Sequence, residues 1–293
     1  MLVGSIEAGG TKFVCAVGDT EYNIIDSHHF ATTSPDSTLS KVIDYFRQFK
    51  ISALGVASFG PLDLDRQSPN FGSIMASPKL DWRNIPIYEI LKKQLQVPIF
   101  LTTDVNGSAY GEYIVGRLRG QQLNSLVYYT VGTGVGAGVI YNGKFIGDLG
   151  HPEMGHVFVK RHPKDRDFTG VCHYHHDCLE GLVSGPTFEV RLGKRGENVS
   201  LNDPVWDVMA YYMAQALIQT TMTLRPSKFV LGGSVLNDTF IQKIRDQYKK
   251  LINDYISLPP LESYIVRPLV ENNGSATIGN FALALNQIQK DKN

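Results

Sequence analysis

Apolar positions along this chain follow two patterns. Some form short continuous runs, and others recur every three to four residues over longer stretches. Residues 35–49 show the helical pattern, since Leu39, Val42, Ile43 and Phe46 fall on one helical face. Apolar runs bounded by glycine-rich turns predict strands. In the first part of the chain we expect strands at 2–7, 12–17, 51–58 and 98–103, a further strand within the first 30 residues, and helices at 35–49, 87–95 and 107–117.

A similar order of elements begins again near Ser125. We expect strands at 126–131, 137–141, 229–232 and 264–267, and helices at 204–223, 236–253 and 274–287. Asn142-Gly143 is a type I′ hairpin signal. Each half thus starts with strand, glycine turn, strand, which predicts two α/β domains with a cleft between them. The first would span 1–117, rejoined by a C-terminal helix at 280–293, and the second 118–279.

The amino-acid composition indicates the general class of protein but not the reaction or ligand. The 293 residues are 43% hydrophobic and 19% charged, as in ordinary soluble globular proteins. Lys+Arg and Asp+Glu number 28 each, which gives no reason to expect nucleic acid or an anionic membrane as partner. The start resembles no secretory signal, and no apolar run reaches the roughly 20 residues of a membrane helix. We therefore expect a cytoplasmic protein without a disulfide framework, with Cys15 as an inert buried thiol.

A cysteine and histidine cluster predicts a metal site. Cys172-x2-His175-x2-Cys178 offers three soft ligands at regular spacing, and six of the eight histidines lie within 151–176. Zinc takes four N or S ligands in a tetrahedron, so His156 is the expected fourth. A site filled in this way is structural rather than hydrolytic. Four other histidines compete for a place in it, and a solvated loop without metal is the alternative reading: His151, His162, His173 and His176.

Two glycine turns join predicted strands, at 8–12 and at 132–136. Glycine lets a backbone approach phosphate closely, and successive N–H groups form an anion-binding concavity. Thr11, Lys12 and Thr133 add donors or charge. For either turn alone, a plain β-turn is the favoured reading. Neither turn is a Walker A loop, and the second matches a Rossmann fingerprint weakly. Together they indicate a nucleotide held from both domains.

Two loops at strand ends carry further candidates. Asp104 follows a predicted parallel strand, where open α/β sheets place ligands, and its carboxylate can take a proton from a substrate hydroxyl. Capping the next helix is an equally good reading for Asp104. Gly232-Gly233 offers flat backbone against which adenine can lie, although a simple strand-to-helix loop has real weight.

In combination these motifs resemble the ROK family of sugar kinases, within the actin-like ATPase (ribonuclease H-like) superfamily. The resemblance spans nearly the whole chain and rests on Glu7–Lys12, Thr103–Gly107, Thr130–Gly136, Glu153–His156, Cys178–Gly181 and Leu231–Ser234. It implies an ATP-dependent hexokinase reaction with Asp104 as base, Mg²⁺ accompanying ATP, Glu7 reaching that ion through water, and a homodimer. The implied phosphate and adenosine contacts are Gly9, Gly10, Thr11, Lys12, Gly132, Thr133, Gly134, Gly232 and Gly233. The implied sugar contacts are Glu153, His156 and Glu180, and we add Thr103, Gly60 and Pro61.

Departures from the family pattern bear on the sugar. Thr103 stands where the family usually has a sugar-binding Asn, which puts the sugar contacts in question. Glu7 replaces the usual Asp, and His175 replaces one thiolate of the zinc segment, and both changes resemble the fructokinase branch. D-fructose is therefore the expected sugar, with glucose or mannose as alternatives.

Other classes fit the motifs less well. Family repressors carry an N-terminal helix-turn-helix, for which a phosphate turn at residue 7 leaves no room. A zinc-dependent binding module leaves the two phosphate turns unexplained. A dehydrogenase is disfavoured because the glycine turns lead into strands rather than helices.

Overall fold

The structure is a computed structural model that describes residues 1–77, 79–147, 150–271 and 274–290 of the 293-residue chain. The chain forms two compact units. Unit 1 contains Met1–Gln122, Phe145–His151 and Leu269–Asn293, and unit 2 contains Leu123–Lys144 and Pro152–Pro268. From the sequence, we expected the boundary between the two domains after residue 117 and the return of the chain to the first domain at residue 280. Residues 291–293 of that expected helix lie outside the described part.

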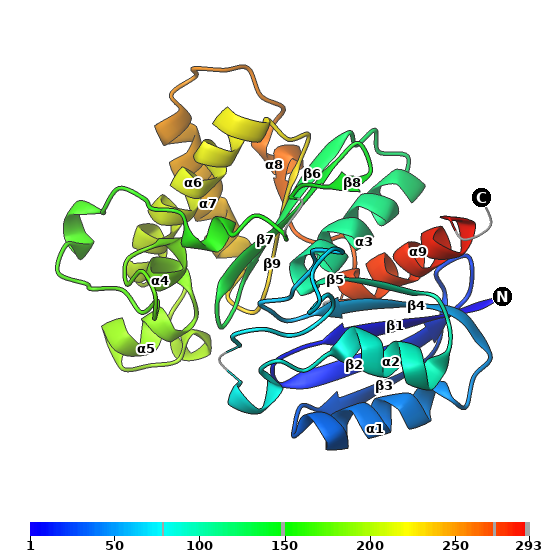
Figure 1. Cartoon of the computed structure of the whole chain (residues 1–293). Coiled ribbons are helices and arrows are strands. Elements are labelled where there is room, and N and C mark those ends of the chain that lie inside the picture. Colours follow the sequence, from blue (N-terminus) through cyan, green and yellow to red (C-terminus); the bar gives the residue numbers. More distant parts are fainter. Residues whose placement is uncertain (78, 148–149, 272–273, 291–293) are drawn as a thin grey trace. The chain divides into compact units, whose positions relative to one another are not determined.

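Unit 1 is built on a five-stranded sheet in the order β3-β2-β1-β4-β5 (Figure 1). Its strands are β1 (Leu2–Ala8), β2 (Lys12–Gly18), β3 (Ile24–Ala31), β4 (Ile51–Ser58) and β5 (Ile99–Thr103). β1, β2 and β3 are antiparallel neighbours, whereas β4 and β5 run parallel to β1. The registers pair Ala8 with Ser58 and Ser58 with Thr103, so three carboxyl ends lie side by side.

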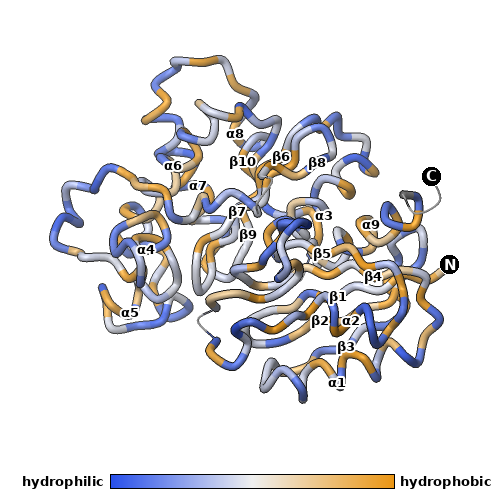
Figure 2. The backbone as a smooth tube through the Cα atoms, viewed as in Figure 1, coloured by the Kyte–Doolittle hydropathy of each residue, from blue (hydrophilic) through white to orange (hydrophobic). Residues whose placement is uncertain are grey.

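Helices cover both faces of this sheet, because successive strand side chains point to opposite faces. Ile6, Leu54 and Val56 pack with α1 (Pro35–Phe46) and α2 (Ile87–Leu95). Val3, Ala16 and Ala53 pack with Phe281 and Ala284 of α9 (Ser275–Lys290). α3 (Asp104–Leu118) lies beside α9, and the short η1 (Leu80–Trp82) brings Trp82 into the first core. Figure 2 shows the apolar strands inside this unit.

Unit 2 repeats the plan with the strand order β10-β9-β6-β7-β8. The strands of this sheet are β6 (Ser125–Val131), β7 (Val135–Tyr141), β8 (Lys144–Phe145), β9 (Phe229–Gly232) and β10 (Ile265–Val266), and Phe145 of β8 already belongs to the unit 1 segment. β6 and β7 form an antiparallel hairpin, and β9 runs parallel to β6. Asn142 and Gly143 both have positive φ, as the expected type I′ turn requires.

The helices of unit 2 fall into a short and a long group. The short ones are η2 (Met154–His156), η3 (Pro163–Asp165), α4 (Leu179–Val183), α5 (Pro186–Leu192), η4 (Gly196–Asn198) and α8 (Leu261–Tyr264). The long ones are α6 (Val205–Leu224) and α7 (Asp238–Ile252), which pack on each other. The Tyr129 hydroxyl of β6 and Thr220 Oγ1 of α6 are hydrogen-bonded at 2.9 Å, which ties α6 to the sheet.

The expected α/β class is confirmed, with two mixed sheets that share one order of strands. Two elements begin two or more residues earlier than their apolar pattern indicated. β7 starts at Val135 rather than 137, and α3 starts at Asp104 rather than 107. Of the helices described here, none combines the length and the apolar content that crossing a bilayer demands.

Candidate active site and metal centre

The carboxyl edge of the unit 1 sheet gathers several of the expected site residues. β1 ends just after Glu7, β4 leads into Phe59-Gly60-Pro61, and β5 leads into Asp104. The Phe59 N–H donates to the Ala8 carbonyl at 2.8 Å, which ties the Gly60-Pro61 loop to the end of β1. The Gly60–Pro61 peptide bond is cis. Parallel strands thus bring Glu7, Gly60, Pro61 and Asp104 to one edge of the sheet.

Asp104 is the first residue of α3, and Thr103 is the residue that caps the helix. The Thr103 hydroxyl accepts the Asn106 N–H at 3.4 Å. Asp104 Oδ1 accepts the adjacent Val105 N–H at 2.8 Å, and the Asp104 side chain is half-buried. The capping alternative considered for Asp104 therefore belongs to Thr103. Thr103 is buried, and its hydroxyl accepts the cap hydrogen bond while keeping its own proton as a donor.

Glu7 shares the environment of Asp104. Burial is the main cause that raises the pKa of the Glu7 carboxyl to about 7, and the charge of Asp104 adds to it, while Lys12 lowers it. Two carboxylates near each other disfavour joint ionisation unless a cation accompanies them. The pair therefore forms an acidic position suited to a hydrated divalent cation, since Mg²⁺ prefers oxygen ligands and retains water.

The first glycine turn follows Glu7 directly. The Gly9 N–H donates to the Lys12 carbonyl at 3.0 Å, and a Cβ on Gly9 would lie 2.7 Å from that oxygen. Glycine is therefore required at this position by a close backbone approach. Thr32 Oγ1 donates to the Gly9 carbonyl at 2.7 Å, which braces the turn, while Thr11 and Lys12 are exposed at its tip.

The second glycine turn and the Gly232-Gly233 loop lie together in unit 2. β6 and β9 pair Thr130 with Gly232, so both loops leave the same edge of the sheet. The Val235 N–H donates to the Val131 carbonyl at 3.0 Å. Gly233 has φ +98°, and a Cβ there would lie 2.3 Å from Val131 O. Its backbone conformation and the close approach both require glycine.

A cavity of about 530 Å³ opens beside these two loops. One wall is formed by Gly132 and Thr133 of the turn and by Ser234, Val235 and Asn237 after β9. The opposite wall comes from α5, the segment around η4 and the start of α6: Gly185, Pro186, Phe188, Glu189, Arg195, Gly196, Glu197, Val199, Leu201 and Trp206. Aromatic side chains with a few polar groups are usual in small-ligand pockets. Gly232 and Gly233 set the path of the loop after β9, and Ser234, Val235 and Asn237, which follow them, line the cavity.

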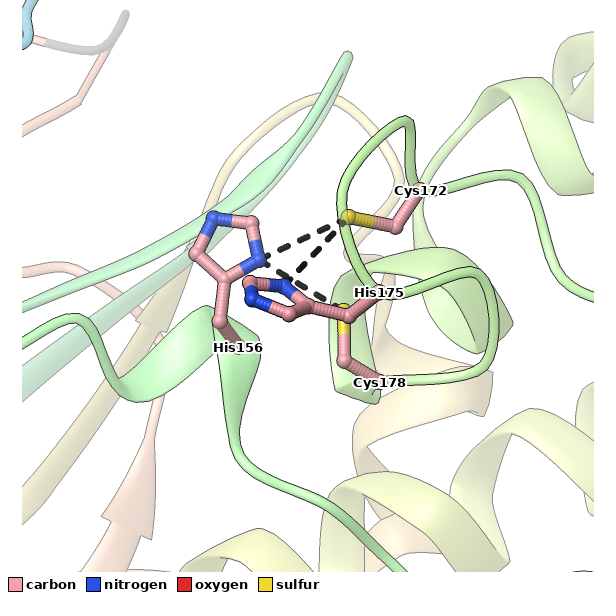
Figure 3. A group of neighbouring side chains, drawn as sticks. All are labelled: His156, Cys172, His175 and Cys178. Carbon is pink, nitrogen blue, oxygen red and sulfur yellow. Dashed lines mark hydrogen bonds between the residues drawn. The ribbon is translucent and has the colours of Figure 1, made fainter.

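The four expected metal ligands converge in unit 2. His156 comes from the end of η2, whereas Cys172, His175 and Cys178 come from one loop that ends at α4 (Figure 3). Their ligand atoms all lie within 4.8 Å of one another. His156 Nδ1 is 3.5 Å from Cys178 Sγ and 3.7 Å from Cys172 Sγ, and His175 Nδ1 is 3.9 Å from Cys172 Sγ.

These distances fit a tetrahedral metal. Bonds of about 2.3 Å to sulfur and about 2.0 Å to nitrogen place such ligands about 3.6 Å apart. Burial and the neighbouring Cys172 raise the pKa of the Cys178 thiol to about 11, so a cation is needed to hold thiolates here at neutral pH. Among the described residues the competing histidines are not in this group, which contains His156, Cys172, His175 and Cys178.

Of the three expected sugar-binding residues, Glu153 and Glu180 flank the metal ligands in the chain, and His156 is itself one of those ligands. Glu153 is exposed immediately before η2, and His156 is the last residue of that helix. Glu180 is half-buried in the first turn of α4, two residues after Cys178. Leu179 N–H donates to the Val157 carbonyl at 2.9 Å, which fastens the two segments together. Within unit 2, therefore, the metal loop brings Glu180 and the Glu153–His156 segment close to each other.

Sequence reasoning missed the wall of the cavity opposite the glycine turn. Phe188 lies on α5 and Trp206 near the start of α6, with the segment 195–201 between them in the chain. α5 has seven residues and η4 has three, too few to show a periodic apolar pattern. Pro186 at the first position of α5 is the one local signal that marked this helix.

Comparison with known proteins agrees with this arrangement of motifs. The sequence profile of the ROK family matches residues 3–287. A protein named Fructokinase from Lactococcus lactis subsp. cremoris is 49% identical over 290 residues, which cover 98% of each chain. Fructokinase from Streptococcus mutans serotype c is 47% identical over 288 residues, covering 97% of each.

Solved structures share the fold at lower identity. A ROK hexokinase from Thermus thermophilus superposes with a TM-score of 0.79 at 22% identity, covering 99% of this chain and 100% of the other. A ROK family glucokinase from Streptomyces griseus, in complex with glucose and AMPPNP, gives a TM-score of 0.72 at 22% identity, covering 98% and 100%. By its profile match, its identity to curated relatives and its fold, the chain belongs to the ROK family.

Proposed function

We propose that this protein is an ATP-dependent hexokinase that transfers the γ-phosphoryl group of ATP to the 6-hydroxyl of D-fructose. The observation that carries the proposal is identity of 49% and 47%, over nearly the full chain, to two proteins named Fructokinase. Relatives named Glucokinase are 29% identical, from Streptomyces coelicolor for example. Glucose and mannose are therefore the competing acceptors to test.

Unit 1 supplies the proton acceptor and the cation position. Asp104 orients the acceptor hydroxyl and takes its proton as the phosphoryl group moves, which is the usual role of a kinase carboxylate. Glu7 would hold Mg²⁺ through water, and Gly9, Gly10, Thr11 and Lys12 would meet phosphate oxygens. The raised pKa of Glu7 beside Asp104 supports a cation at this position. Gly60, Pro61 and Thr103 complete the proposed contacts on this edge.

Unit 2 holds the nucleotide and the sugar. The adenosine would occupy the cavity beside Gly232 and Gly233, with Gly132, Thr133 and Gly134 near its phosphates. Glu153, His156 and Glu180 would bind sugar hydroxyls. Because His156 Nδ1 faces the two sulfur atoms, its Nε2 is left to donate to a hydroxyl.

The metal in this proposal is Zn²⁺, and its role is structural. Two thiolates and two imidazoles fill a tetrahedron and leave no open position for a water nucleophile. The ion would hold the loop that carries Glu180 and would fix the tautomer of His156.

The setting we propose is cytoplasmic, as free thiols and ATP use favour, and the protein is expected to be a homodimer. An ADP-release assay tests the function, with Mg-ATP and fructose, glucose, mannose or N-acetylmannosamine. We expect the fastest turnover with fructose, and loss of that turnover when a zinc chelator is added while Mg-ATP is kept in excess. Faster turnover with another sugar would support a kinase but contradict fructose as the preferred substrate. No ADP release with any of the four sugars would contradict the kinase activity.

A further inference from the structure

The second glycine turn is held by a carboxylate from the metal loop. Glu180 Oε2 accepts the Val135 N–H at 3.0 Å. In the same peptide group, the Gly134 carbonyl accepts the Gly132 N–H at 2.9 Å. The peptide plane between Gly134 and Val135 is thus fixed at both ends. A rotation that re-aimed this part of the turn would break both hydrogen bonds.

A side chain at position 134 would meet this contact. A Cβ added to Gly134 would lie 2.6 Å from Glu180 Oε2 and 3.4 Å from its Cδ. The φ angle of Gly134 is outside the left-handed region, so backbone conformation alone does not require glycine there. An alanine at this position would push the carboxylate away from the Val135 N–H.

Both protein segments that carry metal ligands press on the same turn. A Cβ on Gly155, next to His156, would lie 1.8 Å from the Val135 carbonyl oxygen. On the other side, Cys178 is the N-cap of α4, and the Gly185 N–H that follows α4 donates to the Gly132 carbonyl at 2.7 Å. Val135 is therefore enclosed between the η2 segment and α4, and Glu180 extends from α4 at this point.

We propose that Glu180 is a positioning residue for the phosphate-binding turn 132–136, in addition to its contact with the sugar. One carboxylate oxygen holds the turn through Val135, and the other is left for a sugar hydroxyl. Nucleotide affinity then depends on Glu180 even when no sugar is bound. The inference rests on the proposed function, since it takes this turn as the phosphate-binding one.

Binding of Mg-AMPPNP without sugar, followed by isothermal titration calorimetry, tests the inference. We expect Glu180→Ala to weaken binding about tenfold, on the order of one lost hydrogen bond to a charged group. Glu180→Gln keeps an oxygen that can accept the Val135 N–H, so it should bind the nucleotide within about threefold of wild type while losing sugar affinity. Glu262→Ala, an exposed glutamate of unit 2, is the matched control and should match wild type.

The outcomes separate the two claims. An unchanged dissociation constant in Glu180→Ala would overturn the positioning role and leave the kinase intact. Failure of the wild type to bind Mg-AMPPNP would instead overturn the proposed function. Metal content, measured on each variant, should equal that of wild type, because Glu180 is not a ligand. An equal loss of affinity in Glu180→Gln and Glu180→Ala would also contradict a role carried by the hydrogen bond.

A double-mutant cycle examines the clash at Gly134. Gly134→Ala should weaken Mg-AMPPNP binding in the wild type, and should cost clearly less when Glu180 is already alanine. Additive losses would show that Gly134 acts on the phosphate directly and would overturn the steric link to Glu180.

Discussion

At the scale of single residues, the chemistry depends on how two carboxylates share one sheet edge. Glu7 is the next-to-last residue of β1 and Asp104 begins α3, and the charge of Asp104 helps to raise the pKa of Glu7. Thr103 caps α3 through the Asn106 N–H, and Asp104 Oδ1 accepts the neighbouring Val105 N–H. The role we propose for Asp104 is that of the base, and the role we propose for Glu7 is that of a partner for a hydrated cation.

Asp104→Asn should abolish most turnover while nucleotide and sugar binding persist. An amide keeps the size and one acceptor oxygen but cannot take the proton, and general base catalysis contributes about 10²–10⁴-fold. Steady-state kinetics should show the fall in kcat with little change in KM. Asp36→Asn is the matched control, since Asp36 is an exposed aspartate in the first turn of α1. A variant as fast as wild type would remove Asp104 as the base.

Glu7→Gln should stabilise the protein at alkaline pH in the absence of nucleotide and Mg²⁺. The pKa of Glu7 is about 7 in the folded protein and about 4.5 when unperturbed. Glu7 therefore imposes no penalty below pH 4.5, and stability is lost as pH rises toward and past 7. Thermal unfolding should show a gain in Tm of about 2–6 °C for the variant at pH 8, shrinking toward pH 5. An equal difference at both pH values would contradict the assignment.

At the scale of elements, the metal loop connects otherwise separate short segments. η2, the loop 172–178 and α4 contain few residues each, and none could form a stable helix in isolation. Convergence of His156, Cys172, His175 and Cys178 gives them a common anchor. A structural ion at this position would contribute directly to folding of the segment.

Cys178→Ser should lower metal content and thermal stability together. Serine is a poor ligand for a soft metal site, and Cys178 is fully buried at the start of α4. Metal stoichiometry by atomic emission and Tm by differential scanning fluorimetry provide the measurement. Cys15→Ser also changes a fully buried cysteine but should retain the metal. Wild-type stoichiometry in Cys178→Ser would show that the ligand set is wrong.

The long helices and most strands were predicted from their apolar pattern, and the short helices of unit 2 were not. The strand at 51–58 and the helix at 87–95 were predicted with the bounds that the structure has. α4 and α5 were missed, because five and seven residues carry too little periodicity. α3 begins three residues before the expected start at 107, since its start is set by the Thr103 cap.

Some parts of the candidate site could be predicted from the sequence, and others could not. Cys and His spacing identified the metal group, because ligand chemistry is local in sequence. The contact between Glu180 and Val135 joins residues 45 positions apart, and no local motif encodes it.

At the scale of the whole molecule, the chain leaves unit 1, builds unit 2 and returns at Leu269. The return is anchored by the buried Glu112 carboxylate, which accepts the N–H groups of Leu269 and Val270 at 2.7 and 3.1 Å. α9 then packs beside α3, where Gly107 and Gly111 face Gly279 and Ser275. The apolar helix near the C-terminus was predicted from the sequence. The point at which the chain re-enters unit 1 was not, because it depends on contacts between residues distant in sequence.

Gly111→Ala should destabilise unit 1 through this helix pair. The added Cβ would lie 1.8 Å from the Ser275 carbonyl oxygen, so α9 must shift. Overpacking of this kind costs about 1–3 kcal/mol, which should lower Tm by several degrees. Gly150→Ala is the control, because nothing lies within 4 Å of its added Cβ. Equal thermal stability of the two variants would contradict the close packing of α3 and α9.

The most direct measurement is kcat/KM for D-fructose and D-glucose with Mg-ATP, with the phosphorylated product identified by NMR. The account predicts a clear preference for fructose, fructose 6-phosphate as product, and loss of that product in Asp104→Asn. A preference for glucose, phosphate on another hydroxyl, or no phosphorylated sugar at all would contradict it.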